Sequence, residues 1–407
     1  MVLIADLLHS ALKTARRRWR VTLTLALICA TPVLIVAWKA RKVRVVLAQL
    51  KIDNPQQKSW ANIYIGNKNR MTISITELNG LKDLYYLSGP LYFSLGQTKV
   101  NDISALKGMP MKEFHWSGTQ VTDISALKGM PLTGVDLPGT SITDISALKG
   151  MPLSRLNLRN TSVVDITGLE GMPLIELHLN GSQVIDLKAL KGMPLEYLNL
   201  IKTQVSDISP LKGMLLKDLR LGETPVRDIS ALKDMPLKYL DASNSRVSDI
   251  SALKGMPLEN LNLFETQVAD ISALKGMPLE HLYLSLTRVS DIGALKGMPL
   301  KYLGVSDTRI SDISALKGMP LKYLNLTRTL VSDISALKGM PLEQLDLSYT
   351  QIKDISVLKG MPLERLSLPK TAEGIEFLLH IKTLKTINSR PVRNFWKQYD
   401  KTGKIPN

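Results

Sequence analysis

An aspartate recurs every 21 residues through most of this 407-residue chain. It occupies thirteen positions, from Asp102 to Asp354, and no insertion breaks the spacing. The unit around it reads approximately P-L-x-x-L-x-L-x-x-T-x-V-x-D-I-S-A-L-K-G-M, as in Pro131 to Met151. A fixed period of this length is typical of solenoids, in which each unit buries its apolar face only against its neighbours. The repeat therefore predicts one continuous solenoid.

Each unit contains a strand signal followed by a turn signal. Leu156 and Leu158 alternate with other residues, which predicts a short strand with both leucines on one buried face. Asp144 precedes Ile-Ser-Ala-Leu-Lys and is typical of an N-cap. Gly150 ends that turn, and Pro152 two residues on prevents its continuation. The nine residues from the aspartate to the proline are too few for a long helix, so we expect 3₁₀-like turns.

A hydroxyl residue follows each strand, for example Thr140, Thr161, Ser182 and Thr203. Such hydroxyls can satisfy backbone groups that no regular structure pairs. We expect them to stack along the solenoid and to hydrogen-bond backbone groups of neighbouring units.

The unit resembles the bacterial, internalin-like leucine-rich repeat, L-x-x-L-x-L-x-x-N-x-I-x-D-I-x-x-L-x-x-L. The resemblance covers residues 90–371, as thirteen full units and one partial unit. This unit is one residue shorter, and Thr replaces the usual Asn. The resemblance implies an α/β repeat solenoid, that is, a leucine-rich repeat with a concave parallel β-sheet and short 3₁₀-like turns on the convex side. Because these turns are nearly as thin as strands, we expect a stack of about 60 Å that bends little.

The segments outside the repeats differ from them in composition. Both ends of a solenoid need closing, since each would otherwise expose leucines. In the C-terminal segment, residues 374–387 have apolar residues at helical spacing, which predicts a helix. In the N-terminal segment we expect a capping helix and a strand. The predicted organisation is a basic segment at 1–20, a transmembrane anchor at 21–38, an N-terminal cap at 45–89, the repeats at 90–371 and a C-terminal cap at 372–407.

The apolar stretch near the N-terminus predicts a membrane anchor. Residues 21–37 carry no charge, and Trp19 and Trp38 stand at their two ends. The helix between these tryptophans would span roughly 29 Å, close to the thickness of a hydrocarbon core. The alternatives are a cleaved or lipoprotein-like signal and a buried core helix. Basic residues flank both ends almost equally; we favour a single-pass protein with its N-terminus inside and its repeats extracytoplasmic.

The chain has 52 Lys and Arg against 36 Asp and Glu, but the surplus lies in its two tails. Residues 1–51 hold ten basic residues and one acid, and residues 380–407 hold seven and one. The remainder has 35 basic and 34 acidic residues, which argues against a nucleic-acid partner. The single cysteine, Cys29, excludes a disulfide scaffold and a Cys-based metal site.

No motif indicates catalysis. GxSxG, HExxH, a P-loop and the kinase motifs HRD and DFG are absent, and the units that deviate from the pattern bring no nucleophile and base together. The aspartate column could be a calcium array, but one carboxylate per unit in a turn favours the capping role. We therefore expect no enzymatic activity, no catalytic residue, no cofactor, no metal site and no small-molecule substrate.

The third and fifth residues of each unit vary and should face solvent on the concave sheet. Packing does not demand aromatic residues there, although tyrosine also suits an exposed strand. Rigid amphipathic rings with hydrogen-bonding neighbours are typical of protein-binding surfaces. We therefore predict a partner-binding patch of Tyr239, Asp241, Asn262, His281, Tyr283, Tyr302, Tyr323 and Asn325.

Two functions fit these observations. The first is a membrane-anchored recognition module that binds a protein or peptide ligand, or a surface glycan, through its concave sheet. The alternative is a structural spacer or self-associating cell-envelope component, which the near-identical units favour. An accessory subunit of an enzyme is a third and weaker interpretation.

Overall fold

The structure, a computed structural model, describes residues 61–66, 70–75, 91–94 and 102–406, apart from 109, 110, 119 and 120. Within these ranges the strands form one 18-stranded sheet. Strands β2 to β17 lie parallel in chain order, and β1 and β18 pair antiparallel at the two ends. The predicted parallel solenoid is confirmed.

The strands are short and recur in step with the repeat. Their bounds are β1 Ala61–Gly66, β2 Arg70–Ile75, β3 Leu91–Ser94, β4 Met111–His115, β5 Gly134–Asp136, β6 Arg155–Asn157, β7 Glu176–His178, β8 Tyr197–Asn199, β9 Asp218–Arg220, β10 Tyr239–Asp241, β11 Asn260–Asn262, β12 His281–Tyr283, β13 Tyr302–Gly304, β14 Tyr323–Asn325, β15 Gln344–Asp346, β16 Arg365–Ser367, β17 Thr386–Ile387 and β18 Arg390–Pro391.

One 3₁₀ turn follows each strand from β3 to β16, as the spacing predicts. These turns are η2 Ser104–Leu106, η3 Ser125–Leu127, η4 Ser146–Leu148, η5 Thr167–Leu169, η6 Lys188–Leu190, η7 Ser209–Leu211, η8 Ser230–Leu232, η9 Ser251–Leu253, η10 Ser272–Leu274, η11 Gly293–Leu295, η12 Ser314–Leu316, η13 Ser335–Leu337, η14 Ser356–Leu358 and the longer η15 Ile375–His380.

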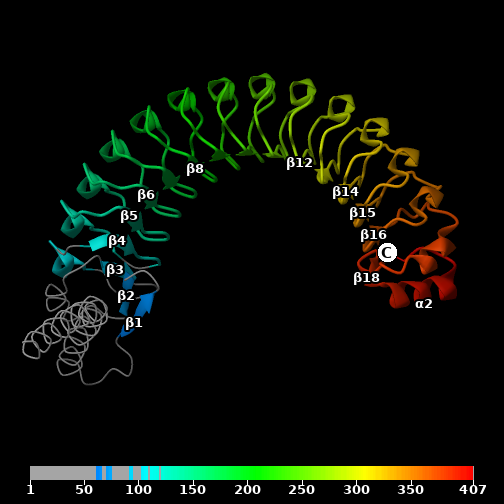
Figure 1. Cartoon of the computed structure of the whole chain (residues 1–407), viewed down its shortest axis with the longest axis horizontal. Coiled ribbons are helices and arrows are strands. Elements are labelled where there is room, and N and C mark those ends of the chain that lie inside the picture. Colours follow the sequence, from blue (N-terminus) through cyan, green and yellow to red (C-terminus); the bar gives the residue numbers. More distant parts are fainter. Residues whose placement is uncertain are drawn as a thin grey trace, which may run out of the picture.

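The solenoid is an arch with its strands on the inner edge and its 3₁₀ turns on the outer edge (Figure 1). The expectation of a stack that bends little is therefore wrong. Hydrogen bonds hold neighbouring strands about 4.8 Å apart on the inner side. A 3₁₀ turn instead makes its backbone bonds internally, as between Leu148 N and Ile145 O at 2.9 Å, and packs on the next turn through side chains. The outer side thus takes more room per unit, and the stack curves.

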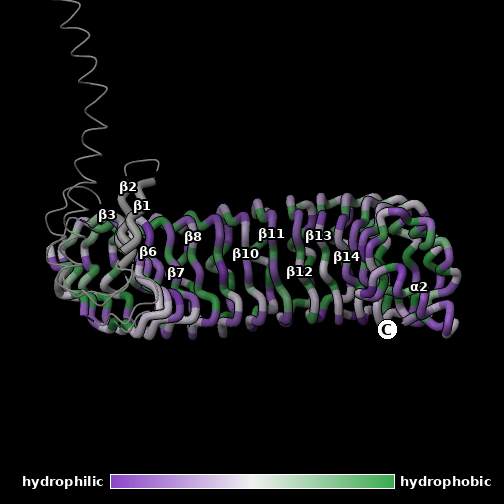
Figure 2. Tube along the Cα trace, turned by 90° about the horizontal axis from the view of Figure 1, so that it is seen from below, coloured by the Kyte–Doolittle hydropathy of each residue, from purple (hydrophilic) through white to green (hydrophobic). Residues whose placement is uncertain are grey.

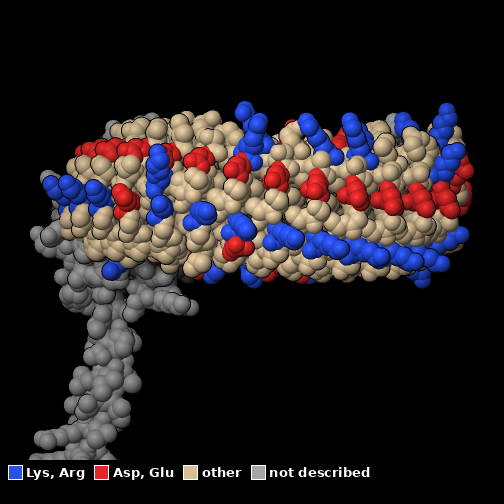
Figure 3. All heavy atoms as spheres, turned by 90° about the horizontal axis from the view of Figure 1, so that it is seen from above, with Lys and Arg blue, Asp and Glu red and all other residues tan. Residues whose placement is uncertain are grey.

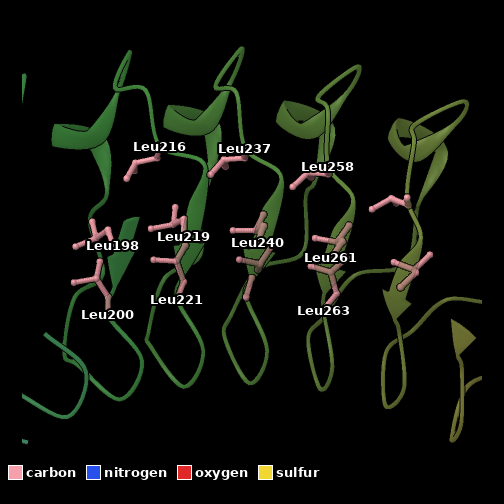
Figure 4. Close-up of a cluster of buried hydrophobic side chains, with 14 of the residues drawn as sticks. Leu198, Leu200, Leu216, Leu219, Leu221, Leu237, Leu240, Leu258, Leu261 and Leu263 are labelled. Carbon is pink, nitrogen blue, oxygen red and sulfur yellow. The ribbon is translucent and has the colours of Figure 1, made fainter. Parts of the chain in front are cut away.

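The core is a set of leucine columns between the sheet and the turns. Leu198, Leu219, Leu240 and Leu261 occupy equivalent positions on successive strands and are fully buried (Figure 4). Each adds about 1.5–3 kcal/mol of burial to a core that its neighbours complete. Seen from the concave side, polar and apolar residues alternate as the chain winds along the arch (Figure 2).

The repeated aspartate holds its turn through an Asx-type bond rather than as the N-cap residue. Asp144 Oδ1 accepts a hydrogen bond from Ser146 N at 2.7 Å, and Oδ2 accepts one from Ser146 Oγ at 3.0 Å. Ile145 takes the N-cap position of η4, one residue later than predicted. The carboxylate reaches the first turn residue from outside, because an Asx side chain bonds the backbone two residues on. Gly150 has φ 75°, which confirms the predicted left-handed end.

The column of hydroxyl residues does not link neighbouring units as predicted. Thr161 and Thr203 are buried, and each donates its Oγ1–H to the carbonyl three residues earlier, Leu158 O or Leu200 O, at 2.7 Å. The accepting carbonyl belongs to the residue just after the strand of the same unit, so the hydroxyl closes the bend within one unit. At the C-terminal end of the column, Thr371 Oγ1 instead reaches Ile352 O of the preceding unit, at 2.6 Å.

The C-terminal cap departs from the sequence prediction. Residues 374–387, expected to be helical, form the short 3₁₀ helix η15 and then strand β17, which extends the parallel sheet by one more rung. The α-helix, α2 Val392–Thr402, follows Pro391, and it buries Phe395 and Trp396 against the end of the core. Ile387 lies 21 residues after Leu366 and pairs with it, so the end of this segment keeps the spacing of the repeat and joins the sheet instead of continuing a helix.

At the other end, β1 and β2 form a hairpin that joins the parallel sheet through β3. Part of the predicted N-terminal cap is thus a strand pair, and the capping helix expected before it lies outside the described residues. The predicted anchor at 21–38 also lies outside them. Among the described residues no helix is long and apolar enough to cross a membrane.

Candidate interaction surface on the concave sheet

The third and fifth residues of each unit lie on the concave surface, on either side of a buried leucine. In β14, Tyr323 and Asn325 are half-buried and Leu324 between them is fully buried. These side chains were expected to face solvent, and they do lie on the surface, but they are only partly exposed. Strands about 4.8 Å apart bring side chains of one column into mutual contact, so each covers part of its neighbours.

Tyr302 is the centre of an aromatic cluster on this surface. Its ring centroid lies 4.0 Å from that of Tyr323, 4.6 Å from that of Tyr283 and 6.2 Å from that of His281. Burial, together with a hydrogen bond to Tyr323, raises the pKa of the Tyr302 hydroxyl. The structure therefore brings together four of the predicted residues, and we call these four the Tyr302 cluster.

A glycine makes room for this packing. Gly304 follows Tyr302 by two residues and pairs with Tyr283 across the ladder. A Cβ at that position would meet Ser285 Oγ at 3.4 Å and the Tyr302 ring at 3.7 Å. Because Gly304 has no side chain, the rings of Tyr283 and Tyr302 can meet diagonally.

Tyr239 belongs to a separate cluster that the sequence prediction missed. The guanidinium carbon of Arg220 lies 4.8 Å from the centroid of the Tyr239 ring and 5.3 Å from that of Tyr197. Arg220 also donates two hydrogen bonds of 3.1 Å to Asp218. We call Tyr197, Asp218, Arg220 and Tyr239 the Arg220 cluster; an arginine at the fifth position between tyrosines at the third position of the flanking units is the signal that could have found it.

The predicted hydrogen-bonding residues already serve the loops that follow their strands. The Oδ1 atoms of Asp241, Asn262 and Asn325 accept backbone N–H groups two residues on, at 3.0, 3.0 and 2.9 Å. Asp241 is buried. Strand β11 has no aromatic side chain, so it separates the Tyr302 cluster from the Arg220 cluster. The remaining polar atoms of these side chains are the ones that a partner could contact.

The first repeats carry charged residues in the same columns. His115 Nε2 lies 3.2 Å from Glu113 Oε2, and His115 Nδ1 lies 3.4 Å from Asp136 Oδ2. The hydrogen bond with Asp136 is the largest cause that raises the pKa of His115. Arg155 Nη2 stands 3.8 Å from Glu113. The concave surface thus changes from charged near β4 to aromatic near β13.

The convex side has a different character. Figure 3 shows a row of acidic residues running beside a row of basic residues on this face. Asp249 and Lys254 are exposed members of the two repeated columns. The pKa of Asp249 is lowered by the backbone hydrogen bond from Ser251 and by that of the Ser251 side chain. Among the described residues no three His, Cys, Asp or Glu side chains converge as a metal site.

This architecture is a leucine-rich repeat, and it is similar in fold to solved structures that include an internalin. An internalin, InlF, from Listeria monocytogenes is 24% identical, with a TM-score of 0.57 over 79% of this chain and 86% of that chain. A leucine-rich-repeat protein of Leptospira interrogans is 20% identical, with a TM-score of 0.57 over 78% and 89%. PEPR1 bound to AtPEP1 is 16% identical, with a TM-score of 0.50 over 78% of this chain and 57% of that chain. The predicted internalin-like leucine-rich-repeat fold is thereby confirmed. No protein-family model and no curated protein matches the chain.

Proposed function

We propose that this protein is a non-enzymatic recognition module that binds an extended protein or peptide on its concave sheet. The observation that carries the proposal is the Tyr302 cluster, in which rings from three neighbouring strands are already packed together. Preformed aromatic surfaces lose little conformational entropy on binding and dominate the energetics of many interfaces. The complex of PEPR1 with AtPEP1 is a precedent for a peptide partner on this fold.

The Arg220 cluster extends the proposed surface toward β8. Arg220 lies between two tyrosine rings, and its guanidinium is held by Asp218. An arginine fixed in this way offers its remaining N–H groups to a carbonyl or carboxylate without first ordering its side chain. The proposed ligand is therefore an extended segment with apolar side chains over β12 to β14 and a hydrogen-bond acceptor over β9.

Binding can be tested with random dodecapeptides displayed on phage and panned against the full-length protein. Replacing Tyr302 and Tyr323 by Ala should weaken the selected peptides by about tenfold or more, equivalent to about 1.4 kcal/mol. The matched control is Tyr349→Ala, because Tyr349 is exposed and lies outside the sheet. Peptides that resist the double change but lose binding when Arg155 and Glu176 are altered would place the site at the other end of the arch.

We further propose that residues 21–38 anchor the protein in a membrane, with the repeats outside the cytoplasm. The support is the uncharged stretch between Trp19 and Trp38. The full chain should then stay with membranes in carbonate, and protease added to intact spheroplasts should remove the repeats. A mature protein that begins near residue 40 would contradict the anchor, and protected repeats would contradict the orientation.

A further inference from the structure

The second residue of each unit is charged from β8 to the C-terminal cap. It precedes the strand, in the segment that returns from the convex turn to the concave sheet, so it lies on one flat side of the arch (Figure 1). Backbone hydrogen bonds of 2.7 to 2.9 Å join each of these residues to the next, so they are consecutive rungs. We call them the charge row: Glu196, Lys217, Lys238, Glu259, Glu280, Lys301, Lys322, Glu343, Glu364 and Lys385.

Within one chain the charge row forms five ion pairs. Their N–O distances run from 2.7 to 2.9 Å, and the side chains are 36% to 66% exposed. Exposed pairs of this kind contribute little to stability. Between the pairs, like charges are neighbours, as with Lys217 and Lys238 or Glu259 and Glu280. A single chain therefore leaves alternating doublets of positive and negative charge on this side.

The order of charges is self-complementary. The row reads E-K-K-E-E-K-K-E-E-K, which is unchanged when it is read backwards with every sign reversed. A two-fold rotation about an axis between Glu280 and Lys301 would therefore place every charge opposite a charge of the other sign. The facing residues would be Glu196 and Lys385, Lys217 and Glu364, Lys238 and Glu343, Glu259 and Lys322, and Glu280 and Lys301.

We propose that this flat side is the interface of a homodimer in which two arches stack face to face with antiparallel strand order. Like-charge doublets of one copy then meet the opposite doublets of the other, which relieves the repulsion left in the monomer. A shift by one unit would place Glu280 against Glu280, and a shift by two units would place Glu259 against Glu280. A shift by four units would again face opposite charges, but only six residues of each row would then meet, so the unshifted register pairs the most opposite charges.

The curvature of the arch agrees with this arrangement. If the two-fold axis runs along the radius of the arch at its midpoint, the two arches superimpose with their convex edges on the same side. The two charge rows then stay in contact along their whole length. A two-fold axis along the tangent would set the convex edge of one copy over the concave edge of the other, and the rows would diverge. The concave sheet remains open in the proposed dimer, so it is compatible with the proposed function without depending on it.

Most residues of the charge row follow a proline by two positions, and these prolines are exposed except for the half-buried Pro236. Because proline has no backbone N–H, burying these prolines in an interface would leave no hydrogen-bond donor without a partner. One unit has Leu215 instead, and its side chain is 68% exposed. In the proposed register Leu215 faces Pro362 of the partner subunit, which would cover this exposed leucine.

The test uses two complementary variants of the full chain in mild detergent at 50 mM salt. The first is Lys217→Glu with Lys238→Glu, and the second is Glu343→Lys with Glu364→Lys. Each alone places like charges across the two-fold axis and should weaken dimerisation at least tenfold by light scattering. An equimolar mixture should restore it as a heterodimer, captured through two different tags. The control, Arg246→Glu with Arg288→Glu, makes the same change of charge in a different column and should have no effect.

Salt and cross-linking provide independent measurements on the unaltered protein. Raising the salt to 500 mM should weaken dimerisation at least tenfold, because the Debye length falls well below the roughly 10 Å found at 0.1 M. A carbodiimide should link Lys217 to Glu364. These residues are seven units apart in one chain, roughly 34 Å along the ladder, so this product identifies the intermolecular contact. A protein that stays monomeric at about 100 μM, a dimer indifferent to both charge reversals, or the absence of this cross-link would overturn the proposal.

Discussion

The rings of Tyr302 and Tyr323 lie face to face on neighbouring strands, with centroids 4.0 Å apart and planes 4° from parallel. The two residues pair directly in the parallel register of β13 and β14. Because the ladder holds the two backbones at nearly the stacking distance of two rings, no side-chain rearrangement is needed to bring the rings together. The stack is therefore part of the folded protein before any ligand arrives.

This stacking should be measurable as a coupling energy. Tyr302→Ala and Tyr323→Ala should each destabilise the protein, and the double variant should lose about 0.5–1.5 kcal/mol less than their sum, since the ring contact is lost only once. Urea unfolding of the four proteins measures this cycle. The same cycle with Tyr302 and Tyr349 should show no coupling; equal values in the two cycles would contradict the stack.

The buried hydroxyls should contribute according to the bonds that they make. Thr203→Val removes the 2.7 Å bond to Leu200 O and should cost about 1 kcal/mol. The matched control is Ser182, whose Oγ is buried and makes no hydrogen bond within the described part of the chain. Ser182→Ala should be close to neutral in the same thermal melts. A larger loss at Ser182 than at Thr203 would show that packing, and not the bond, sets the effect.

The left-handed residue after each 3₁₀ turn should govern stability in both directions. Asp234 stands where other units have glycine, with φ 64°, and the equivalent Gly255 has φ 76°. Asp234→Gly should stabilise the protein by about 0.5–1 kcal/mol, and Gly255→Asp should destabilise it by a similar amount. No Cβ clash complicates the second change, because nothing lies within 4 Å of a Cβ at Gly255. Changes of the same sign at both sites would contradict this explanation.

The aspartate column should make stability depend on acid pH. Hydrogen bonds from Ser230 and Ser251, first of all from their backbone N–H groups, hold the pKa values of Asp228 and Asp249 below the ordinary 3.8. The folded state thus binds these protons less readily than the unfolded state. Their contribution is present above pH 3.8 and is lost as the pH falls through the lowered pKa values.

Circular dichroism melts from pH 6 to pH 2.5 test this sign. The protein should melt above the variant Asp228→Asn with Asp249→Asn at pH 6, since asparagine keeps the acceptor oxygen but not the charge. The gap between the two melting temperatures should narrow as the pH falls. A gap that widens in acid would mean that these carboxylates have raised pKa values in the folded protein.

Most of the fold follows from local and periodic features of the chain. Leu156 and Leu158 predict one buried face, and both are buried, although β6 ends one residue before Leu158. Gly150 and Pro152 predict the end of a tight turn, and the positive φ of Gly150 confirms it. These features repeat without a break, so their spacing alone requires parallel strands in register. The helix expected over 374–387 is limited to the short 3₁₀ helix η15, because Thr386 and Ile387 still carry the spacing of the repeat and join the sheet as β17.

The candidate site was less accessible from the sequence. The columns of variable residues could be read directly, and they contain Tyr283, Tyr302 and Tyr323, which the structure brings into contact. The same columns contain Arg220 and Tyr239, but the direction of a side chain on the sheet decides which neighbour it meets. Asn325 Oδ1 also accepts a hydrogen bond from Thr327 N in the loop that follows the strand, and the columns of variable residues in the sequence do not reveal this bond.

The sequence by itself determined the repeat, the parallel order of the strands and the residues that form the core, because each depends on a pattern that recurs within one unit. Only the tertiary structure decided the curvature and the division of the concave residues into two clusters. The curvature depends on the difference in room between strands and turns, and the clusters depend on contacts between residues of neighbouring units, such as Tyr283, Tyr302 and Tyr323. Such contacts exist only once neighbouring units have packed.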